Sequence, residues 1–276
     1  MQYCQDITLS EIQQFEECEI AAWTDLFKTA SKEDIGALRL EFHKIGHGVF
    51  SAAANVDVLA FNRTLVLGFD LTIDEDLIDM IIDRFSRLHV NRFFIQADPV
   101  SQSKRLVEIL SSRGFGHYNN WVRLYLDIAE APAAKSDLHI EQITSRHAGA
   151  FADIVSIGFG WPTVINSWVQ KSVGRANWRH YMAFDGEKPV ATGALYMHNE
   201  LAWFSFASTL SDYRGRGAQG ALIAKRIGDA SKLGCKRIVV ETAQDKPDKP
   251  SPSNRNMLRF GFRAAYVRPN YIRVTN

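Results

Sequence analysis

Three patterns follow one another without a break in the second half of the chain: a strand, a glycine-rich loop and a helix. The strand-like Leu201–Ala207 leads into STLSDYRGRGAQGA, which starts at Ser208, and a helical pattern then runs from Gln219 to Leu233. Glycines let a backbone turn tightly without a Cβ in the way. The N–H groups of such a loop converge at the helix N-terminus, where the helix dipole favours an anion. The stretch predicts a pyrophosphate site, with a plain surface turn as the alternative.

Two well-known phosphate loops do not fit this stretch. A P-loop needs Lys followed by Ser or Thr after its last glycine, whereas Gly220 is followed by Ala221 and Leu222. The dinucleotide pattern GxGxxG can be written over the glycines, but no βαβ unit precedes it, and only Glu241 stands near the position of its acidic residue. The meander of strands before the loop also contradicts a dinucleotide-binding start.

The surrounding elements are predicted from periodicity and turn residues. Helices are expected at Ser145–Ile157 and Thr163–Val173, and strands at His180–Phe184 and Val190–Met197. After the loop and its helix, a buried strand, a short helix and two short strands follow at Lys236–Thr242, Ser253–Phe260, Phe262–Val267 and Tyr271–Val274.

Arg214-Gly215-Arg216-Gly217-Ala218-Gln219 resembles motif A of the GNAT superfamily of acyl-coenzyme A N-acetyltransferases, [RQ]-x-x-G-x-[GA]. The last position departs from the pattern, since Gln219 stands there and Gly220 follows. DGEKPVATGALYMHNELAWFSFASTLSDYRGRG resembles the family's strands 2 to 4 with motif A, and SPSNRNMLRFGF resembles its second cofactor-contacting helix. The resemblance covers about residues 138–276.

The resemblance implies acetyl-coenzyme A as the co-substrate and a set of contacts for it. The strand end at Ala207, Ser208 and Thr209 is expected to contact the pantetheine arm, and Ser253 or Asn256 the far side of the cofactor. The expected pyrophosphate site comprises Arg214, Gly215, Arg216, Gly217, Ala218, Gln219 and Gly220.

Family chemistry implies direct attack of a neutral amine on the thioester in a ternary complex, with an oxyanion stabilised by a strand-4 N–H. Glu241, at the end of a predicted strand, is the first candidate for the general base, with a solvated strand-end carboxylate as the alternative. Many family members place a tyrosine acid where this chain has Met257, so Tyr266, Tyr271 or water is left to protonate the thiolate.

Three aromatic residues lie in the region where the family builds its acceptor pocket. Phe159, Trp161 and Trp168 either line an apolar acceptor site or pack in the core, and the sequence leaves both interpretations open.

The sequence of the first half predicts the same order of helices and strands as the second half, but it contains no phosphate loop. A helix is expected from Ser10 to Ala30. Strands are expected at Ala37–His43, Val49–Asn55, Val58–Phe61, Thr64–Phe69, Arg92–Ala97 and Trp121–Leu126, and further helices at Asp74–Leu88 and Ser101–Arg113. The loop at residues 70–75 is acidic and repels a pyrophosphate. With a linker at Ala129–Asp137, we expect an α/β (α+β) chain of two GNAT-like domains, each with a mixed, mostly antiparallel sheet flanked by helices. These are a degenerate domain at 1–130 and an N-acetyltransferase domain at 137–276.

The distribution of charge and the cysteine content indicate which classes of partner and which compartment we expect. Residues 1–135 hold 13 Lys and Arg against 20 Asp and Glu, so the excess of positive charge lies in the second half. A run of arginines at positions 255, 259, 263 and 268 lacks an aromatic platform, and coenzyme A phosphates explain it better than nucleic acid does. Histidines without metal-ligand spacing predict no metal. Three scattered cysteines and no signal-peptide or membrane-span pattern predict a cytoplasmic protein without membrane contact.

The sequence thus predicts an N-acetyltransferase acting on a primary amine of a small molecule or peptide. The alternative is an acyl-coenzyme A sensor without turnover, and a nucleic-acid-binding protein is the weakest of the three hypotheses. Neither the acceptor nor the oligomeric state follows from the sequence.

Overall fold

The structure is a computed structural model that describes residues 7–67, 73–97, 104–128 and 134–275. The chain forms two compact units. Unit 1 comprises Met1–Phe27, Lys32–Arg123 and Ala265–Asn276, and unit 2 comprises Lys28–Ser31 and Leu124–Ala264. The last strand of the chain therefore belongs mostly to unit 1, so the units do not follow from a single cut in the sequence.

Unit 1 contains four helices and a mixed sheet in the part that the structure describes. The helices are α1 (Leu9–Lys28), α2 (Lys32–Leu38), α3 (Glu75–Arg87) and α4 (Lys104–Ser112). The strands are β1 (Leu40–Ile45), β2 (Gly48–Ala53), β3 (Arg63–Leu67), β4 (Arg92–Ala97), most of β11 (Arg263–Val274) and the first part of β5 (Gly116–Asp127). Their order is β1-β2-β3-β4-β11-β5; β3 and β4 are parallel, and β11 is antiparallel to β4.

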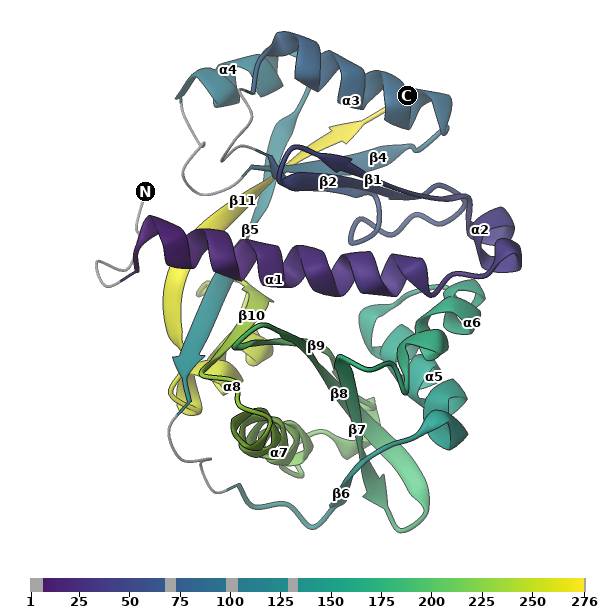
Figure 1. The fold of residues 1–276 in the computed structure, drawn as a ribbon, viewed down its shortest axis with the longest axis vertical. Coiled ribbons are helices and arrows are strands. Elements are labelled where there is room, and N and C mark those ends of the chain that lie inside the picture. Colours follow the sequence, from purple (N-terminus) through teal and green to yellow (C-terminus); the bar gives the residue numbers. More distant parts are fainter. Residues whose placement is uncertain (1–6, 68–72, 98–103, 129–133, 276) are drawn as a thin grey trace. The chain divides into compact units, whose positions relative to one another are not determined.

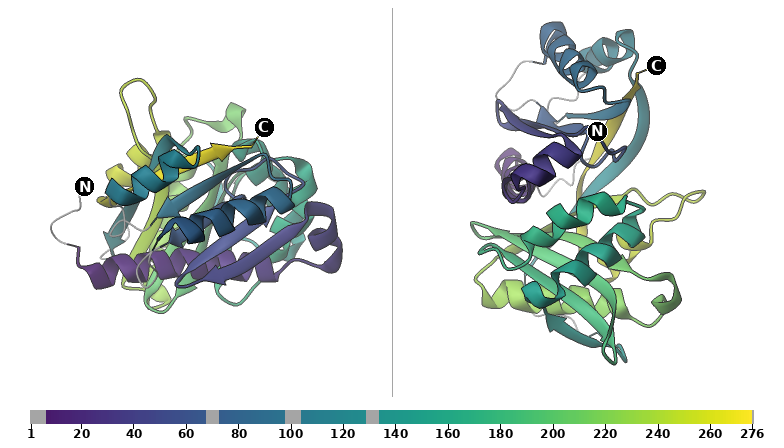
Figure 2. Two further views of the ribbon diagram at one scale, coloured as in Figure 1. Left: turned by 90° about the horizontal axis from the view of Figure 1, so that it is seen from above. Right: turned by 90° about the vertical axis from the view of Figure 1, so that its right-hand side faces the viewer.

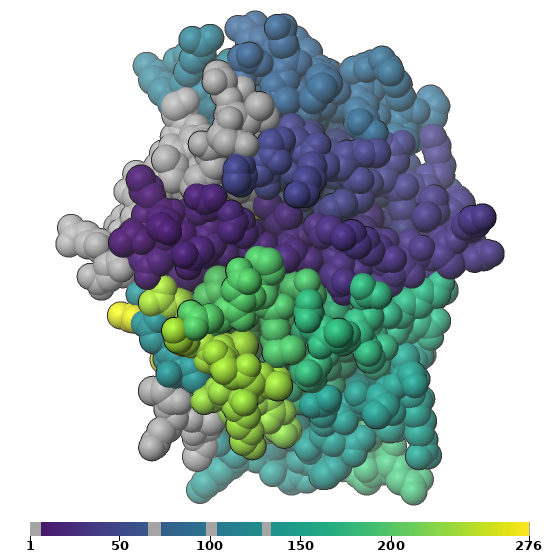
Figure 3. All heavy atoms as spheres, viewed as in Figure 1, coloured from purple at the N-terminus to yellow at the C-terminus, as the bar shows by residue number. Residues whose placement is uncertain are grey.

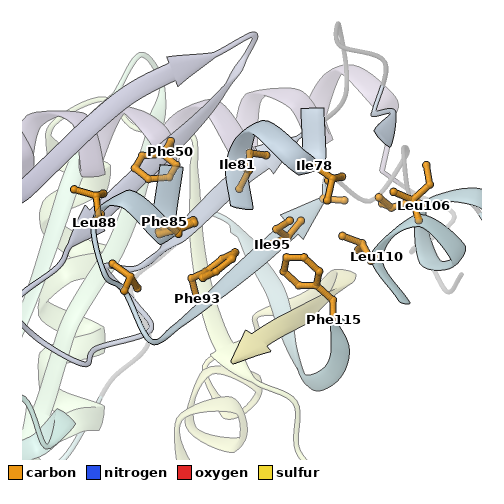
Figure 4. Close-up of a cluster of buried hydrophobic side chains, with 14 residues drawn as sticks. Phe50, Ile78, Ile81, Phe85, Leu88, Phe93, Ile95, Leu106, Leu110 and Phe115 are labelled. Atoms are coloured by element: carbon orange, nitrogen blue, oxygen red, sulfur yellow. The ribbon is translucent and has the colours of Figure 1, made fainter. Parts of the chain in front are cut away.

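Alternation along the strands supplies both faces of the unit 1 sheet with apolar side chains. On β2, Phe50 packs in a buried cluster with residues of α3 and α4, such as Phe85 and Leu110 (Figure 4). Its neighbour Val49 packs instead with Trp23 of α1. Helices therefore cover both faces of this sheet, with α3 and α4 opposite α1 (Figures 1 and 2). The outer side of α1 forms a continuous band on the face shown in Figure 3.

A buried ionic cluster lies beneath α1. Glu16 and Glu19 of α1 accept hydrogen bonds from Arg123 of β5 and Arg268 of β11, and all four side chains are at most 1% exposed. Arg63 of β3 joins them, with Nη2 3.2 Å from Glu19 Oε1. Such a cluster is stable only because every carboxylate meets several guanidinium groups. It ties α1 to three strands of unit 1.

Unit 2 has the antiparallel meander that the sequence predicts. Its strands are the end of β5, β6 (His139–Gln142), β7 (Trp178–Asp185), β8 (Lys188–His198), β9 (Leu201–Thr209) and β10 (Arg237–Ala243), in the order β5-β10-β9-β8-β7-β6. Among the pairs of unit 2 whose register is defined, β9 and β10 are parallel and the others are antiparallel. The helices are α5 (Ala148–Phe159), α6 (Asn166–Val169), α7 (Ala218–Lys232) and α8 (Pro252–Arg259), and α5 and α7 cover opposite faces of the sheet (Figure 2).

Four expected strands need correction. Residues 32–38 form α2, so the strand predicted at Ala37–His43 begins only at Leu40. The predicted strand Val58–Phe61 is a turn, closed by a hydrogen bond from Phe61 N to Val58 O. The two C-terminal strands are one strand, β11, which continues through Pro269 because the extended φ of proline suits a strand.

The expected linker Ala129–Asp137 and the acidic loop at residues 70–75 lie partly outside the described residues. The division of the chain at 130 and 137 stays a prediction.

Candidate functional site

The glycine-rich loop forms the N-terminus of α7, as the sequence predicts. Gly215 and Gly217 have φ values of +80° and +77°, the left-handed region that favours glycine. Gly217 is the N-cap residue, and the first hydrogen bond of the helix runs from Ala221 N to Gly217 O. The N–H groups of Ala218, Gln219 and Gly220 precede that bond and lack partners within the helix. The loop therefore presents converging donors with the positive end of the helix dipole.

The side chain of Gln219 joins this helix to the end of β9. Its Nε2 donates to Ser208 O and to Thr209 Oγ1, both at 2.9 Å. The family pattern has Gly or Ala at this position, so the link is a property of this chain. It fixes the loop relative to the strand that precedes it.

Strand β9 contains a bulge close to its end. Thr192 pairs with Ser208 and Ala194 with Ser205, so Phe206 and Ala207 together face Gly193 of β8. Phe206 has a φ of +50°, which is strained for a residue with a large side chain. Its ring packs against Phe151 and Trp178.

The bulge changes where the backbone of β9 points. Thr192 Oγ1 donates to Phe206 O, and Leu210 N donates to Val190 O, so both groups face β8. Because an antiparallel ladder alternates, Thr209 directs its N–H and C=O away from β8.

Strands β9 and β10 separate on that same side. Their parallel pairing runs from Arg237 with Leu201 to Val240 with Phe204 and stops there, although both strands continue. Glu241 is the first residue of β10 beyond the last pair, and its side chain is partly exposed. Backbone groups of β9 thus face the side on which the strands diverge, and Glu241 lies on β10 where the divergence begins.

The two arginines of the loop have different surroundings. Arg216 pairs with Asp137 and, at 3.0 Å, with Asp185, and these hydrogen bonds raise the pKa of Arg216 and lower those of both carboxyl groups. Arg214 is exposed, and no ion pair of its side chain occurs in the described part of the chain. Arg214 is therefore the loop cation available to an anion, whereas Arg216 stabilises the loop itself.

The residues before β6 lie against the same loop. Ser136 Oγ donates to Arg216 O at 2.9 Å, and a Cβ built on Gly217 would lie 2.4 Å from Lys135 O. A side chain at Gly217 would collide with this backbone and not only with a ligand. Gly215 has nothing within 4 Å of its Cβ position, so it is the better place to change the loop.

Comparisons with known proteins agree with this geometry. Residues 156–262 match the acetyltransferase (GNAT) family. The chain contains a GNAT acyltransferase domain. A GCN5-related N-acetyltransferase from Kribbella flavida is similar over 96% of both chains, with 12% identity and a TM-score of 0.65. A tandem GNAT protein from the clavulanic acid biosynthesis pathway is similar over 95% of this chain and 94% of its own, with 12% identity and a TM-score of 0.55. A search of curated proteins finds no match.

These structural similarities extend over nearly the whole chain, so both units have GNAT-like folds and the predicted fold class is confirmed. The GNAT match lies in the second half only, as the glycine-rich loop predicts.

Helix α8 is the helix that was expected to contact the cofactor in addition to α7. Ser251 caps it by accepting from Asn254 N, and Asn254 Nδ2 donates to Thr242 Oγ1, which ties the helix to β10. Ser253 is exposed and Asn256 partly exposed, so both remain accessible to a ligand. Met257 is buried, so the place of the usual tyrosine is an apolar core position.

Tyr266 lies in the ionic cluster of unit 1. Its hydroxyl hydrogen-bonds to Glu16 and accepts from Arg123 Nε at 3.3 Å, and its side chain is buried. Burial and the neighbouring Glu16 carboxylate raise the pKa of Tyr266 well above its usual value. These surroundings are those of a structural residue and weaken the assignment of Tyr266 as general acid.

The basic run predicted to meet coenzyme A phosphates is dispersed. Arg268 is fully buried in the same cluster of unit 1, and Arg263 and Arg255 pair with Asp127 and Asp245. Arg268 was expected to belong to the basic run, but because its side chain is buried, coenzyme A phosphates do not account for its positive charge.

The three aromatic residues of the possible acceptor site divide into two groups. Trp168 is completely buried in the core. Phe159 is 48% exposed and stacks on Trp161 with ring centroids 4.8 Å apart. Ile157 and Val164, close to this pair in the sequence, are exposed apolar side chains as well.

Several site residues were not recognised in the sequence. Gly158 lets α5 approach β9, since a Cβ there would lie 1.7 Å from Ser208 Oγ. Ser205 Oγ, just before the bulge, is buried without a hydrogen-bond partner in the described part of the chain. An isolated glycine in a helix or strand pattern is the one sequence signal for such close approaches, and Gly158 and Gly193 both show it.

The described residues contain no group of three or more His, Cys, Asp or Glu side chains suited to a metal ion. Among the same residues, none of the helices has the length and apolar character to cross a bilayer.

Proposed function

We propose that the GNAT domain transfers an acetyl group from acetyl-coenzyme A to a primary amine of a small-molecule or peptide acceptor, by direct attack in a ternary complex. The observation that carries the proposal is the bulge of β9 beside the gap that opens after Val240 and Phe204. The N-terminus of α7, joined to β9 through Gln219, lies at the end of the same strand. The carboxyl-terminal edge formed by the ends of β9 and β10 thus offers an anion site, backbone groups that point away from β8, and a carboxylate.

The residues of this edge suit the parts of acetyl-coenzyme A. The N–H groups from Gly215 to Gly220 and the Arg214 guanidinium bind the pyrophosphate in this proposal, with Arg216 supporting the loop through its two carboxylates. Ala207 and Thr209 bind the pantetheine arm through their backbone groups, and Ser208 positions them. Ser253 and Asn256 contact the far side of the cofactor.

The reaction requires one bond to form and one to break. The amine nitrogen attacks the thioester carbonyl carbon, the C–S bond breaks, and coenzyme A leaves as the thiolate. Glu241 takes the proton of the amine, and an N–H of the bulge stabilises the carbonyl oxygen as it becomes negative. Because Met257 is apolar, Tyr266 is buried in the ionic cluster of unit 1, and Tyr271 packs against the apolar cluster of that unit, water is the proposed proton source for the thiolate.

The second candidate function is an acyl-coenzyme A sensor. The buried Met257 favours it, since methionine cannot donate the proton that many GNAT enzymes supply from this position. The two functions differ in turnover and not in cofactor binding. Release of free thiol from acetyl-coenzyme A over a broad panel of amines separates them.

A matched pair of variants tests the cofactor site. Gly215→Asp and Gly215→Asn are nearly isosteric, and both side chains tolerate the left-handed conformation. The position has open space, so a steric effect on the loop is small. The added carboxylate faces the proposed pyrophosphate, and we expect Gly215→Asp to bind acetyl-coenzyme A at least about tenfold more weakly than Gly215→Asn. Equal affinities measured by calorimetry would reject the site.

We place the reaction in the cytoplasm and expect no nucleic acid or membrane partner. Cys18 and Cys235, the cysteines that the structure describes, are buried and form no disulfide bond, which suits a reducing compartment.

A further inference from the structure

Arg226 of α7 is a fully buried cation on the inner face of its helix. Its Nε donates to Leu222 O within the helix, and its Nη1 donates to Ala194 O of β8, both at 3.1 Å. Its Cζ lies 4.2 Å from the centre of the Phe204 ring of β9. The guanidinium thus touches both strands of the bulged pair.

The charge of Arg226 is not neutralised. In the part of the chain that the structure describes, no carboxylate pairs with this side chain, and its Nη2 has no hydrogen-bond partner. Asp229, three residues further along α7, pairs with Lys225 at 3.0 Å. Tyr181 is the neighbouring titratable group, and burial raises its pKa, so it stays neutral. Burial also lowers the pKa of Arg226 to about 9, which leaves it charged at neutral pH.

The guanidinium of Arg226 lies against the β8 residue that is opposite the bulge. Gly193, which faces Phe206 and Ala207, has its α-carbon against Arg226: a Cβ built there would lie 3.0 Å from Arg226 Cζ. The absence of a side chain at Gly193 therefore makes room for the charge directly behind the bulge. An alanine at this position would force the guanidinium to shift by a few tenths of an ångström.

An apolar side chain would be the more stable choice at position 226. A buried charge without a counter-ion costs several kcal/mol, and replacing buried ions by apolar side chains is often neutral or stabilising. A residue that violates this rule beside a strained backbone indicates a functional constraint. A fixed positive charge in a medium of low polarity stabilises a developing negative charge nearby.

We propose that Arg226 is a positioning residue for acyl transfer, which holds Ala194 and Phe204 behind the bulge and places a positive charge on the α7 side of the forming oxyanion. This inference rests on the function proposed above. The charge acts through the strand pair and does not touch the substrate.

The first test compares Arg226→Met with Lys225→Met. Both remove one positive charge from α7, but Lys225 is partly exposed and paired with Asp229. We expect Arg226→Met to retain acetyl-coenzyme A affinity and KM, to have an unchanged or higher melting temperature, and to lose about tenfold in kcat, as for a charge roughly 10 Å away at an effective dielectric of about 20. Lys225→Met should keep the wild-type kcat.

The second test needs no acceptor. Acetyl-coenzyme A with a ¹³C-labelled carbonyl is bound to the protein, and the carbonyl stretch is measured by infrared difference spectroscopy. In the wild type the stretch should lie below that of free acetyl-coenzyme A, and in Arg226→Met it should move back toward the free value. Arg226→Lys should restore most of the shift. Gly193→Ala, which displaces the guanidinium but keeps the charge in the protein, should reduce it even if Arg226→Met does not fold.

The outcomes separate the two proposals. A wild-type protein that does not bind acetyl-coenzyme A overturns the proposed function and this inference with it. Binding with an identical carbonyl stretch in the wild type, Arg226→Met and Gly193→Ala overturns the role of Arg226 alone. A lower melting temperature together with weaker cofactor binding in Arg226→Met would assign Arg226 a purely structural role.

Discussion

Replacing Glu19 by Gln removes one of the two carboxylates of the ionic cluster in unit 1. Glu19 Oε2 accepts from Arg123 at 2.5 Å and from Arg268 at 2.8 Å, and Oε1 accepts from Arg63 at 3.2 Å. Glutamine has nearly the same shape but no charge. Glu16 would then be the remaining carboxylate of the cluster, in contact with Arg123 and Arg268, and Arg63 would lose its contact with the Glu19 carboxylate.

The cost follows from the burial of this cluster. Breaking a buried ion pair by removing one partner destabilises a protein by about 3–5 kcal/mol, because the other charge stays buried. We expect about 4 kcal/mol for Glu19→Gln, a large part of the roughly 5–15 kcal/mol that holds a domain folded. For a urea dependence of about 2 kcal/mol per M, the unfolding midpoint of unit 1 should fall by about 2 M.

Hydrogen exchange measured in increasing urea reports the stability that Glu19→Gln removes from unit 1. Mass spectrometry of peptides that contain β4 reports the opening of the sheet between β3 and β11. The matched control is Glu17→Gln, on the same helix but 39% exposed, with His47 as a partner at 3.9 Å. The control should change the stability by less than about 0.5 kcal/mol. Equal midpoints for the two variants would refute the assignment of the cluster as a stabilising element.

The effect should also depend on pH with a defined sign. Burial acts to raise the pKa of Glu19, but the charges of Arg268, Arg123 and Arg63 outweigh it, so its pKa lies far below the usual value. A depressed carboxyl pKa contributes stability above the unfolded-state value of about 4.3, and this contribution is lost as the pH falls through the folded-state value. The gap between wild type and Glu19→Gln should therefore be constant above about pH 5.5 and shrink in acid. A gap that widens in acid would contradict this sign.

Three further predictions concern the link to the loop, the acceptor and the last strand. Gln219→Ala removes two hydrogen bonds to the end of β9, each of which contributes roughly 0.5–1.5 kcal/mol. Acetyl-coenzyme A binding measured by calorimetry should therefore weaken about fivefold. An unchanged affinity would show that these hydrogen bonds do not support the cofactor site. Phe159→Ala should raise the KM of the acceptor about tenfold without changing the KM of acetyl-coenzyme A. Leu233, 44% exposed against 48% for Phe159, caps the C-terminus of α7, and Leu233→Ala should change neither KM. Deleting residues 265–276 removes most of β11 from between β4 and β5 and should leave unit 1 unfolded or aggregated by circular dichroism and light scattering; a soluble, cooperatively folded unit 1 would show that the strand is dispensable.

Local patterns predicted most of unit 2 because its elements are consecutive in the chain. The alternation in β7 to β9, the glycines of the loop and the apolar stripe of α7 are all local signals, and the structure has each element within two residues of its expected place. Errors fell where tertiary packing outweighs propensity. The residues at 58–61 have strand-like side chains but form a turn, and Asn62 behind them is buried, with Oδ1 accepting from Ala53 N and Nδ2 donating to Val56 O.

Site residues divide in the same way. The loop and its helix were visible because a phosphate site needs glycines in a fixed order. The bulge of β9 was not, since it arises from a register shift against β8 that neither strand shows alone. Tyr266 was judged from its place in a late strand, and only the fold shows it bonded to Glu16, 250 residues away in sequence.

The sequence by itself determined that a helix begins directly after the glycine-rich turn, and therefore where an anion site is expected. This follows from backbone sterics and the helix dipole, which act over a few residues. Only the tertiary structure decided that the last strand belongs mostly to unit 1, that Arg216 is occupied by Asp137 and Asp185, and that Arg226 lies charged behind the bulge. Those properties depend on which distant segments meet and on how much water they exclude, and charges in a buried site interact far more strongly than the same residues do in an unfolded chain.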